Sequence, residues 1–166
     1  MIVLVLGGAR SGKSAFAERL AAGLPEPVTY VATLEVGDDP ELADRVATHR
    51  QRRPAGWSTV EPGAGLPDAL AQLGGTALVD SLGPWLAGLA GMAADPEPLC
   101  SALARRAGDT VVVSEEVGLG VHPSSEAGRQ FRDSLGTLNQ AVAAVADRVV
   151  LVVAGRALTL HPPEAI

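Results

Sequence analysis

Short apolar runs alternate along this chain with segments whose apolar residues recur every three or four positions. The runs lie at residues 2–6, 28–33, 76–80, 110–114 and 149–153. Strands that are apolar on both faces are typical of parallel sheets covered by helices, so this pattern predicts buried strands at these places. Weaker patterns predict a short strand at 57–61 and an edge strand at 157–160.

Segments with helical spacing of apolar residues separate these runs. The expected helices span residues 13–23, 40–53, 66–73, 84–91, 96–107 and most of 124–147. Pro40 marks the start of the second helix and Pro54 follows its end, because proline is tolerated in the first turn but not in the interior. The alternation predicts an α/β fold with an open, mostly parallel sheet and helices on both faces, in one domain of residues 1–166.

Composition argues against several classes of protein. The chain has 166 residues and a formal net charge of −6, which disfavours a protein that chiefly binds nucleic acid. Its single cysteine, Cys100, excludes a disulfide framework. No apolar run reaches the roughly 18 residues that cross a membrane, and the first residues lack the basic segment of a signal peptide. We therefore expect a cytoplasmic protein without a membrane span.

Residues 7–14 read GGARSGKS and match the pattern G-x-x-x-x-G-K-[ST] between a predicted strand and a predicted helix. In such loops the backbone N–H groups and the helix N-terminus face phosphate oxygens. The lysine reaches the β- and γ-phosphates, and the next hydroxyl binds Mg²⁺. The predicted nucleotide-binding residues are Gly7, Gly8, Ala9, Arg10, Ser11, Gly12, Lys13 and Ser14. Lys13 is also the predicted catalytic residue and Ser14 a ligand of Mg²⁺, but the loop alone does not separate a kinase from an ATPase or a GTPase.

Such a site needs an acidic residue at the end of a neighbouring strand. Asp80 ends the strand at 76–80, and Glu115 and Glu116 follow the strand at 110–114. Each of them is also compatible with a solvated acid at a strand end. We expect at least one to bind Mg²⁺, with Asp80 as the first candidate and Glu116 as the alternative.

The predicted helix at 40–53 carries a histidine among arginines. Arg45, His49 and Arg53 share one face, and Arg52 lies close to it. The arginines disfavour the imidazolium form and can hold a phosphate, which suits a phosphohistidine or nucleotidyl-histidine intermediate. The residues alone nevertheless favour a plainer interpretation, either a solvated basic helix or a histidine at the edge of the core.

Taken in order, the motifs resemble the bifunctional adenosylcobinamide kinase/adenosylcobinamide-phosphate guanylyltransferase family of cobalamin biosynthesis. Besides the phosphate loop, the matching blocks are YVAT at 30–33, RVATHRQRRP at 45–54, VDSL at 79–82, EVGLGV at 116–121, FRD at 131–133 and LNQ at 138–140. The likeness covers nearly the whole chain. The order and spacing of the blocks, rather than any one of them, make it specific.

This resemblance implies a nucleotide-kinase-like P-loop fold and two reactions. ATP or GTP phosphorylates a hydroxyl of adenosylcobinamide, and GTP then donates GMP to adenosylcobinamide phosphate through a guanylyl-histidine, giving adenosylcobinamide-GDP. The resemblance implies that His49 is that catalytic histidine, which reverses the plainer interpretation, and that the protein is a homotrimer. The further implied nucleotide-binding residues are Ala32, Thr33, Leu34, Arg50, Gln51, Arg52, Arg53, Glu61 and Asp80.

Three positions depart from the pattern of that family. Glu115 stands where the family often has Asn, and Ser81 and Gly83 stand where Cys and Thr are common. The departure at Glu115 concerns how the substrate is positioned, and it leaves the reaction class unchanged. The alternatives are a member with only the kinase or only the transferase activity, and a P-loop nucleotide-binding regulator. Trp57 and Trp85 are candidates either for stacking on the corrin ring or for the core.

Overall fold

Seven strands of the described residues form one sheet in the order β3-β2-β4-β5-β1-β6-β7. The computed structural model describes residues 1–34 and 53–163. The strands are β1 (Ile2–Gly7), β2 (Val28–Ala32), β3 (Ser58–Val60), β4 (Thr76–Asp80), β5 (Thr110–Glu115), β6 (Arg148–Val153) and β7 (Arg156–Leu160). Every strand pair is parallel except β6 and β7, which are antiparallel. The mostly parallel sheet predicted from the sequence is therefore confirmed.

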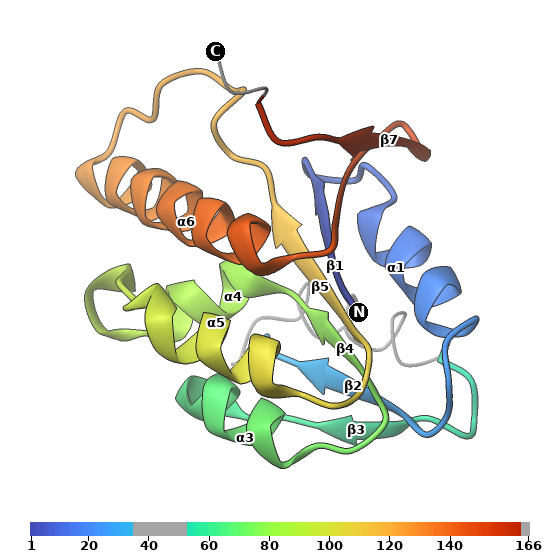
Figure 1. Cartoon of the computed structure of the whole chain (residues 1–166). Helices are drawn as coiled ribbons and strands as arrows, with labels where there is room; N and C mark the ends of the chain where they lie inside the picture. The colour runs from blue at the N-terminus through green and yellow to red at the C-terminus, as the bar shows by residue number, and fades with distance from the viewer. Residues whose placement is uncertain (35–52, 164–166) are drawn as a thin grey trace.

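Helices cover both faces of this sheet (Figure 1). They are α1 (Lys13–Ala21), α3 (Leu66–Gln72), α4 (Leu82–Gly88), α5 (Pro96–Arg105) and α6 (Glu126–Val145), with 3-10 turns η1 (Gly63–Gly65) and η2 (Ala90–Met92). In Figure 1, α1 lies on one side of the sheet and α3 to α6 lie on the other. None of the helices in the described ranges combines the length and apolar character that crossing a membrane requires.

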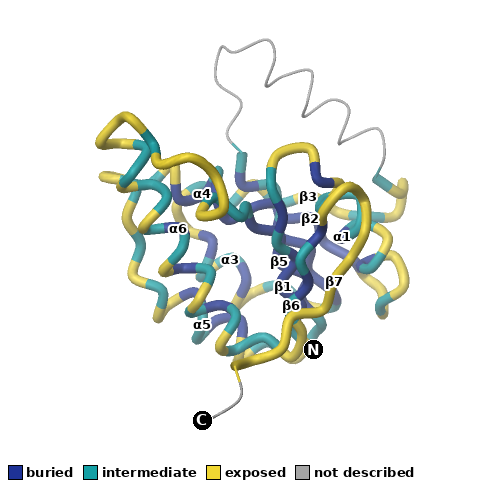
Figure 2. Tube along the Cα trace, turned by 90° about the horizontal axis from the view of Figure 1, so that it is seen from above, coloured by how far each residue is buried: buried dark blue, intermediate teal, exposed yellow. Residues whose placement is uncertain are grey.

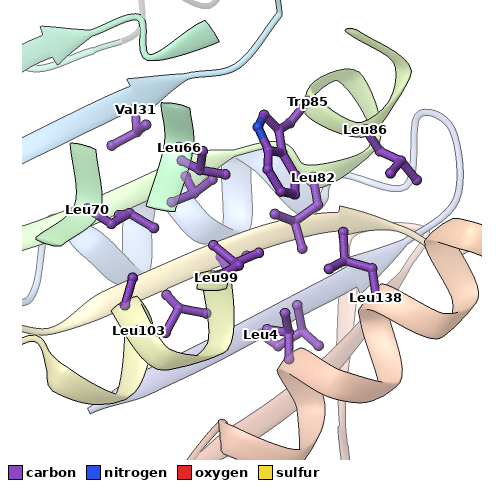
Figure 3. Close-up of a cluster of buried hydrophobic side chains, with 14 of the residues drawn as sticks. Leu4, Val31, Leu66, Leu70, Leu82, Trp85, Leu86, Leu99, Leu103 and Leu138 are labelled. Carbon is purple, nitrogen blue, oxygen red and sulfur yellow. The ribbon is translucent and has the colours of Figure 1, made fainter. Parts of the chain in front are cut away.

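Two apolar clusters fill the space between the sheet and its helices. The larger cluster joins Leu4 and Val112 of the sheet to Leu66, Leu86 and Leu138 of α3, α4 and α6 (Figure 3). The smaller cluster packs Ala17 and Ala21 of α1 against the opposite face of the same strands. Figure 2 shows the central strands buried and β7 exposed along its length. The continuous apolar runs in the sequence are explained by the burial of these strands on both faces.

Most predicted elements agree with the structure to within one or two residues, and α4 is the main difference. We expected a helix over 84–91, but α4 begins at Leu82, so Pro84 occupies its first turn, where no helical N–H partner is needed. The helix ends at Gly88, and Gly91 takes a positive φ of 65° within η2. The predicted helix over 40–53 lies outside the described residues, except for Arg53.

The hairpin between β6 and β7 contacts the loop after β1. Ala154 and Gly155 both have positive φ angles, 49° and 71°, as a two-residue hairpin turn requires. The N–H of Gly155 donates to the carbonyl oxygen of Ser11 at 2.8 Å. The turn between β6 and β7 thus supports the phosphate loop from the side opposite β5.

Candidate functional site

The loop over residues 7–14 joins the carboxyl end of β1 to the first turn of α1. Gly12 precedes the helix with a φ of 92°, and Arg10 also has a positive φ, 55°. A side chain at Gly7 would overlap Ser11 Oγ, so the loop curls tightly over its own first residue. Ser11 is 8% exposed, and its hydroxyl has no hydrogen-bond partner among the described residues. The loop therefore has the strand–loop–helix geometry expected of a phosphate site.

Lys13 lies between this loop and the end of β5. Its Nζ is 3.4 Å from the carbonyl oxygen of Gly8 and 3.5 Å from Glu115 Oε1. The side chain of Lys13 is 13% exposed. An ammonium in this position could contact phosphate oxygens bound by the loop, which is the role predicted for Lys13.

Asp80 connects the loop to β2. Ser14 Oγ donates to Asp80 Oδ1 at 3.1 Å, and the Tyr30 hydroxyl donates to Asp80 Oδ2 at 2.5 Å. Burial raises the pKa of Tyr30, and the neighbouring Asp80 carboxylate raises it further, so the phenol stays protonated as a donor. The hydroxyl and carboxylate that were predicted to bind Mg²⁺ thus lie in direct contact.

These two oxygens fit Mg²⁺ by their chemistry. Mg²⁺ binds through one or two carboxylate or hydroxyl oxygens and completes its shell with phosphates and water. Within residues 1–34 and 53–163, no group of three or more His, Cys, Asp or Glu side chains could hold a metal ion. A cation held by Ser14 and Asp80 would take its remaining ligands from phosphate oxygens and water.

Glu116, the alternative acid, is engaged elsewhere. Its carboxylate accepts from the N–H groups of Gly118 at 2.8 Å and Leu119 at 3.1 Å, while its own N–H donates to Gly7 O. The carboxylate therefore shapes the loop after β5. It is Asp80 whose carboxylate contacts Ser14.

Arg53 extends the same network toward β3. Its guanidinium stacks on the Tyr30 ring, 3.5 Å from the ring centroid, and donates to Thr59 Oγ1 at 3.2 Å. Arg53, Trp57, Thr59 and Glu61 line a depression of about 520 Å³. The structure thus brings together Arg53 and Glu61, two predicted nucleotide contacts, and links Arg53 through Tyr30 to Asp80.

A second cavity lies near the ends of β2 and β5. It measures about 480 Å³, and its lining includes Thr33, Leu34, Trp85 and Glu115. Trp85 is only 5% exposed and belongs to the larger core cluster, with its Nε1 donating to Ala64 O at 3.4 Å. Its ring is therefore mainly a core residue whose edge reaches the cavity.

The sequence of this chain matches a known family. The family model described as Cobinamide kinase / cobinamide phosphate guanyltransferase matches residues 3–160. The chain belongs to this family. It is 44% identical over 167 residues to the bifunctional adenosylcobalamin biosynthesis protein CobP of Pseudomonas aeruginosa, with 95% of each chain covered. It is 39% identical over 181 residues to the bifunctional adenosylcobalamin biosynthesis protein CobU of Salmonella typhimurium, with 93% of this chain and 97% of the relative covered.

Solved structures with a similar fold are more distant in sequence. An ATPase from the type III secretion system of pathogenic bacteria superimposes with a TM-score of 0.52 at 10% identity, over 90% of this chain and 50% of that chain. The flagellar accessory protein FlaH from Methanocaldococcus jannaschii gives 0.50 at 13% identity, over 94% and 74%. At such identities the likeness shows the fold alone, and that fold is the P-loop α/β fold expected from the sequence.

In this member of the family, the described site residues gather at one edge of the sheet. The phosphate loop, Asp80 and Arg53 are joined by the contacts above, and Ala32 pairs with Asp80 at the end of β2. His49, Arg50, Gln51 and Arg52 lie outside the described residues. The contact between Lys13 and Glu115 was not foreseen, although the position of Glu115 at the end of a strand beside β1 is a signal for it.

Proposed function

We propose that this chain carries both activities for which its family is named. In the first, ATP or GTP phosphorylates adenosylcobinamide, and in the second, GMP from GTP is transferred to adenosylcobinamide phosphate. One observation carries the proposal. The chain has a phosphate loop that contains Lys13, with a contact between Ser14 and Asp80 beside it, and it is 44% identical, over 95% of its length, to a relative named as bifunctional. We also propose that the single domain of residues 1–166 suffices for both reactions.

The described residues would have different roles in phosphoryl transfer. The backbone of residues 7–14 would bind the phosphates, and Lys13 would offset the charge that develops on the transferred group. Ser14 and Asp80 would hold Mg²⁺, which neutralises charge on the phosphates when bound. Arg53 and Glu61, in the depression next to Tyr30, are proposed contacts of the nucleotide, together with Ala32, Thr33 and Leu34.

The second reaction needs a nucleophile, and we propose His49 on the strength of the family resemblance. A neutral imidazole nitrogen of His49 would form a bond to the α-phosphorus of GTP while the bond to pyrophosphate breaks. A phosphate oxygen of the cobinamide phosphate would then attack the same phosphorus, and the histidine would leave. Arg50, Gln51 and Arg52 are proposed to contact the transferred nucleotide.

Labelling of the protein tests this proposal directly. The chain is incubated with GTP labelled on the α-phosphate and then denatured, and the label on the protein is measured after acid and after alkali. We expect a label that is lost in acid and kept in alkali, as a phosphoramidate bond to histidine requires. Phosphorylation of cobinamide without any such label would indicate a kinase-only member. Nucleotide binding with neither reaction would indicate a regulator.

The homotrimer and the cytoplasmic location are further proposals that rest on the resemblance and on the sequence. Sedimentation equilibrium of the purified chain measures the first, with a mass of three chains as the expected result. A mass of one chain that persists at high protein concentration would contradict it. Fractionation of cells that express the chain tests the second.

A further inference from the structure

The cavity of about 480 Å³ opens where the strands next to the phosphate loop end. Its lining includes Thr33 after β2, Gly83 at the start of α4 and Glu115 at the end of β5. The aromatic side chains of the lining are Trp85 and Phe131. Thr33 Oγ1 already donates to the carbonyl oxygen of Ser81 at 2.5 Å. An apolar cavity of this volume with few polar groups is typical of a small-molecule site.

Glu115 is the charged residue of this lining, and the protein holds its carboxylate in place. Ser81 Oγ donates to Oε1 at 2.8 Å, and the N–H of Gly83 donates to Oε2 at 3.0 Å. An ionised carboxylate has about four positions that accept hydrogen bonds. Two donors therefore fix its orientation and still allow it to accept a hydrogen bond from a molecule in the cavity.

The same carboxylate also faces the phosphate loop. Glu115 Oε1 lies 3.5 Å from Lys13 Nζ. In loops of this kind the lysine contacts the phosphoryl group that is transferred. A hydroxyl that reaches Glu115 from the cavity would therefore lie next to the γ-phosphate, as an acceptor must.

We propose that this cavity binds the hydroxyl-bearing arm of the alcohol that is phosphorylated, and that Glu115 accepts the hydrogen bond of that hydroxyl. The proposal deepens the proposed kinase function and rests on it. In the transfer, the alcohol oxygen forms a bond to the γ-phosphorus, and the bond from that phosphorus to the bridging oxygen breaks. The nucleoside diphosphate leaves with the electron pair, and the hydroxyl proton passes to Glu115.

A variant with a smaller cavity tests whether the cavity binds the arm of the alcohol. Ala87 is an exposed residue of α4 in the lining, so Ala87→Leu reduces the space without replacing a core side chain. Ala104→Leu makes the same change on an exposed position of α5 outside the lining. We expect Ala87→Leu to raise the Kd for cobinamide, measured by equilibrium dialysis, at least about 10-fold while nucleotide affinity stays the same. Equal cobinamide affinity in the two variants, or a loss of nucleotide affinity instead, would overturn the assignment of the cavity.

Glu115→Gln tests the role of the carboxylate. The amide keeps the size of the side chain but accepts the hydroxyl proton poorly, so we expect kcat for cobinamide phosphorylation to fall about 100-fold. Nucleotide affinity should not weaken, and the α-phosphate label on the protein should persist, because neither involves the acceptor hydroxyl. Glu97→Gln, at an exposed position in the first turn of α5, is the matched control. If nucleotide affinity and kcat fell together in Glu115→Gln, Glu115 would act through Lys13 and the proposal would be wrong.

The unaltered chain separates these outcomes from failure of the proposed function. If it phosphorylates no cobinamide, the kinase function itself is contradicted. If it phosphorylates cobinamide while Ala87→Leu and Glu115→Gln behave like their controls, the kinase function stands and the acceptor site lies elsewhere.

Discussion

Replacing Arg106 with methionine should destabilise the fold at the edge of the sheet where the strands begin, away from the candidate site. The guanidinium donates to the carbonyl oxygens of Leu70 at 2.9 Å, Leu73 at 2.8 Å and Gly75 at 2.7 Å. Its Nε donates to Thr110 Oγ1 at 3.0 Å. Leu70 and Leu73 lie at the end of α3, where the Leu70 carbonyl oxygen also accepts from the N–H of Leu73 at 3.3 Å. One side chain thus joins α3 to the starts of β4 and β5.

The expected loss is about 3 kcal/mol of unfolding free energy. A hydrogen bond contributes about 1 kcal/mol net, and one from a charged donor about 1.5–3 kcal/mol. Four such bonds are lost. Methionine, however, avoids the cost of partly burying a cation, a cost that is also the reason why burial lowers the pKa of Arg106 in the folded protein. Water can reach some of the freed carbonyl groups, because Arg106 is only half-buried.

Urea unfolding followed by circular dichroism measures this loss, with the exposed neighbour in Arg105→Met as the control. For a chain of this size about 3 kcal/mol corresponds to a melting temperature lower by roughly 6–12 °C. We expect kcat of the kinase reaction at low temperature to be unchanged, because no site residue contacts Arg106 in the described part of the chain. Equal stability of the two variants would refute the assignment of this structural role.

Three further predictions concern the site itself. Lys13→Ala should reduce turnover of triphosphate about 100-fold or more while the circular dichroism spectrum is preserved, and near-normal kinase activity would remove Lys13 from the site. Asp80→Asn should raise the Mg²⁺ concentration needed for half-maximal activity about 10-fold or more. If Glu116→Gln raised this concentration instead and Asp80→Asn did not, the choice of Asp80 would be wrong. His49→Asn should abolish the α-phosphate label and guanylyl transfer but leave some kinase activity. In the unaltered chain the labelling rate should fall at acidic pH, because protonation removes the attacking lone pair; a label on His122 or His161 would contradict this choice.

The fold was predictable because its strands are buried on both faces. The runs at 76–80 and 110–114 became β4 and β5 nearly to the residue, since continuous apolar character and flanking helices leave few alternatives. The limits of α4 were less predictable. Proline suggests a helix start at several neighbouring positions, and the actual start depends on how Leu82 and Trp85 pack in the core.

The phosphate loop was also predictable from the sequence, because the residues that form it are adjacent in the chain. Gly7 to Ser14 are consecutive, and their backbone conformation follows from their own glycines. The network around Asp80 is different, since Ser14, Tyr30 and Arg53 come from separate elements. Each of these residues could be named as a candidate from its position, but their mutual contacts depend on the strand order. The structural role of Arg106 could not be predicted, because the sequence has no pattern that marks an arginine as a donor to backbone carbonyl groups.

The three positions at which the sequence was expected to depart from the family pattern, 81, 83 and 115, contact one another in the structure. Ser81 and Gly83 lie more than 30 residues from Glu115 in the chain, yet both donate to its carboxylate. A Cβ at position 83 would overlap Glu115 Oε2, so a glutamate in this conformation requires glycine there. Ser81 and Gly83 thus hold a carboxylate beside Lys13, Ser81 through its hydroxyl and Gly83 through its N–H and its lack of a Cβ.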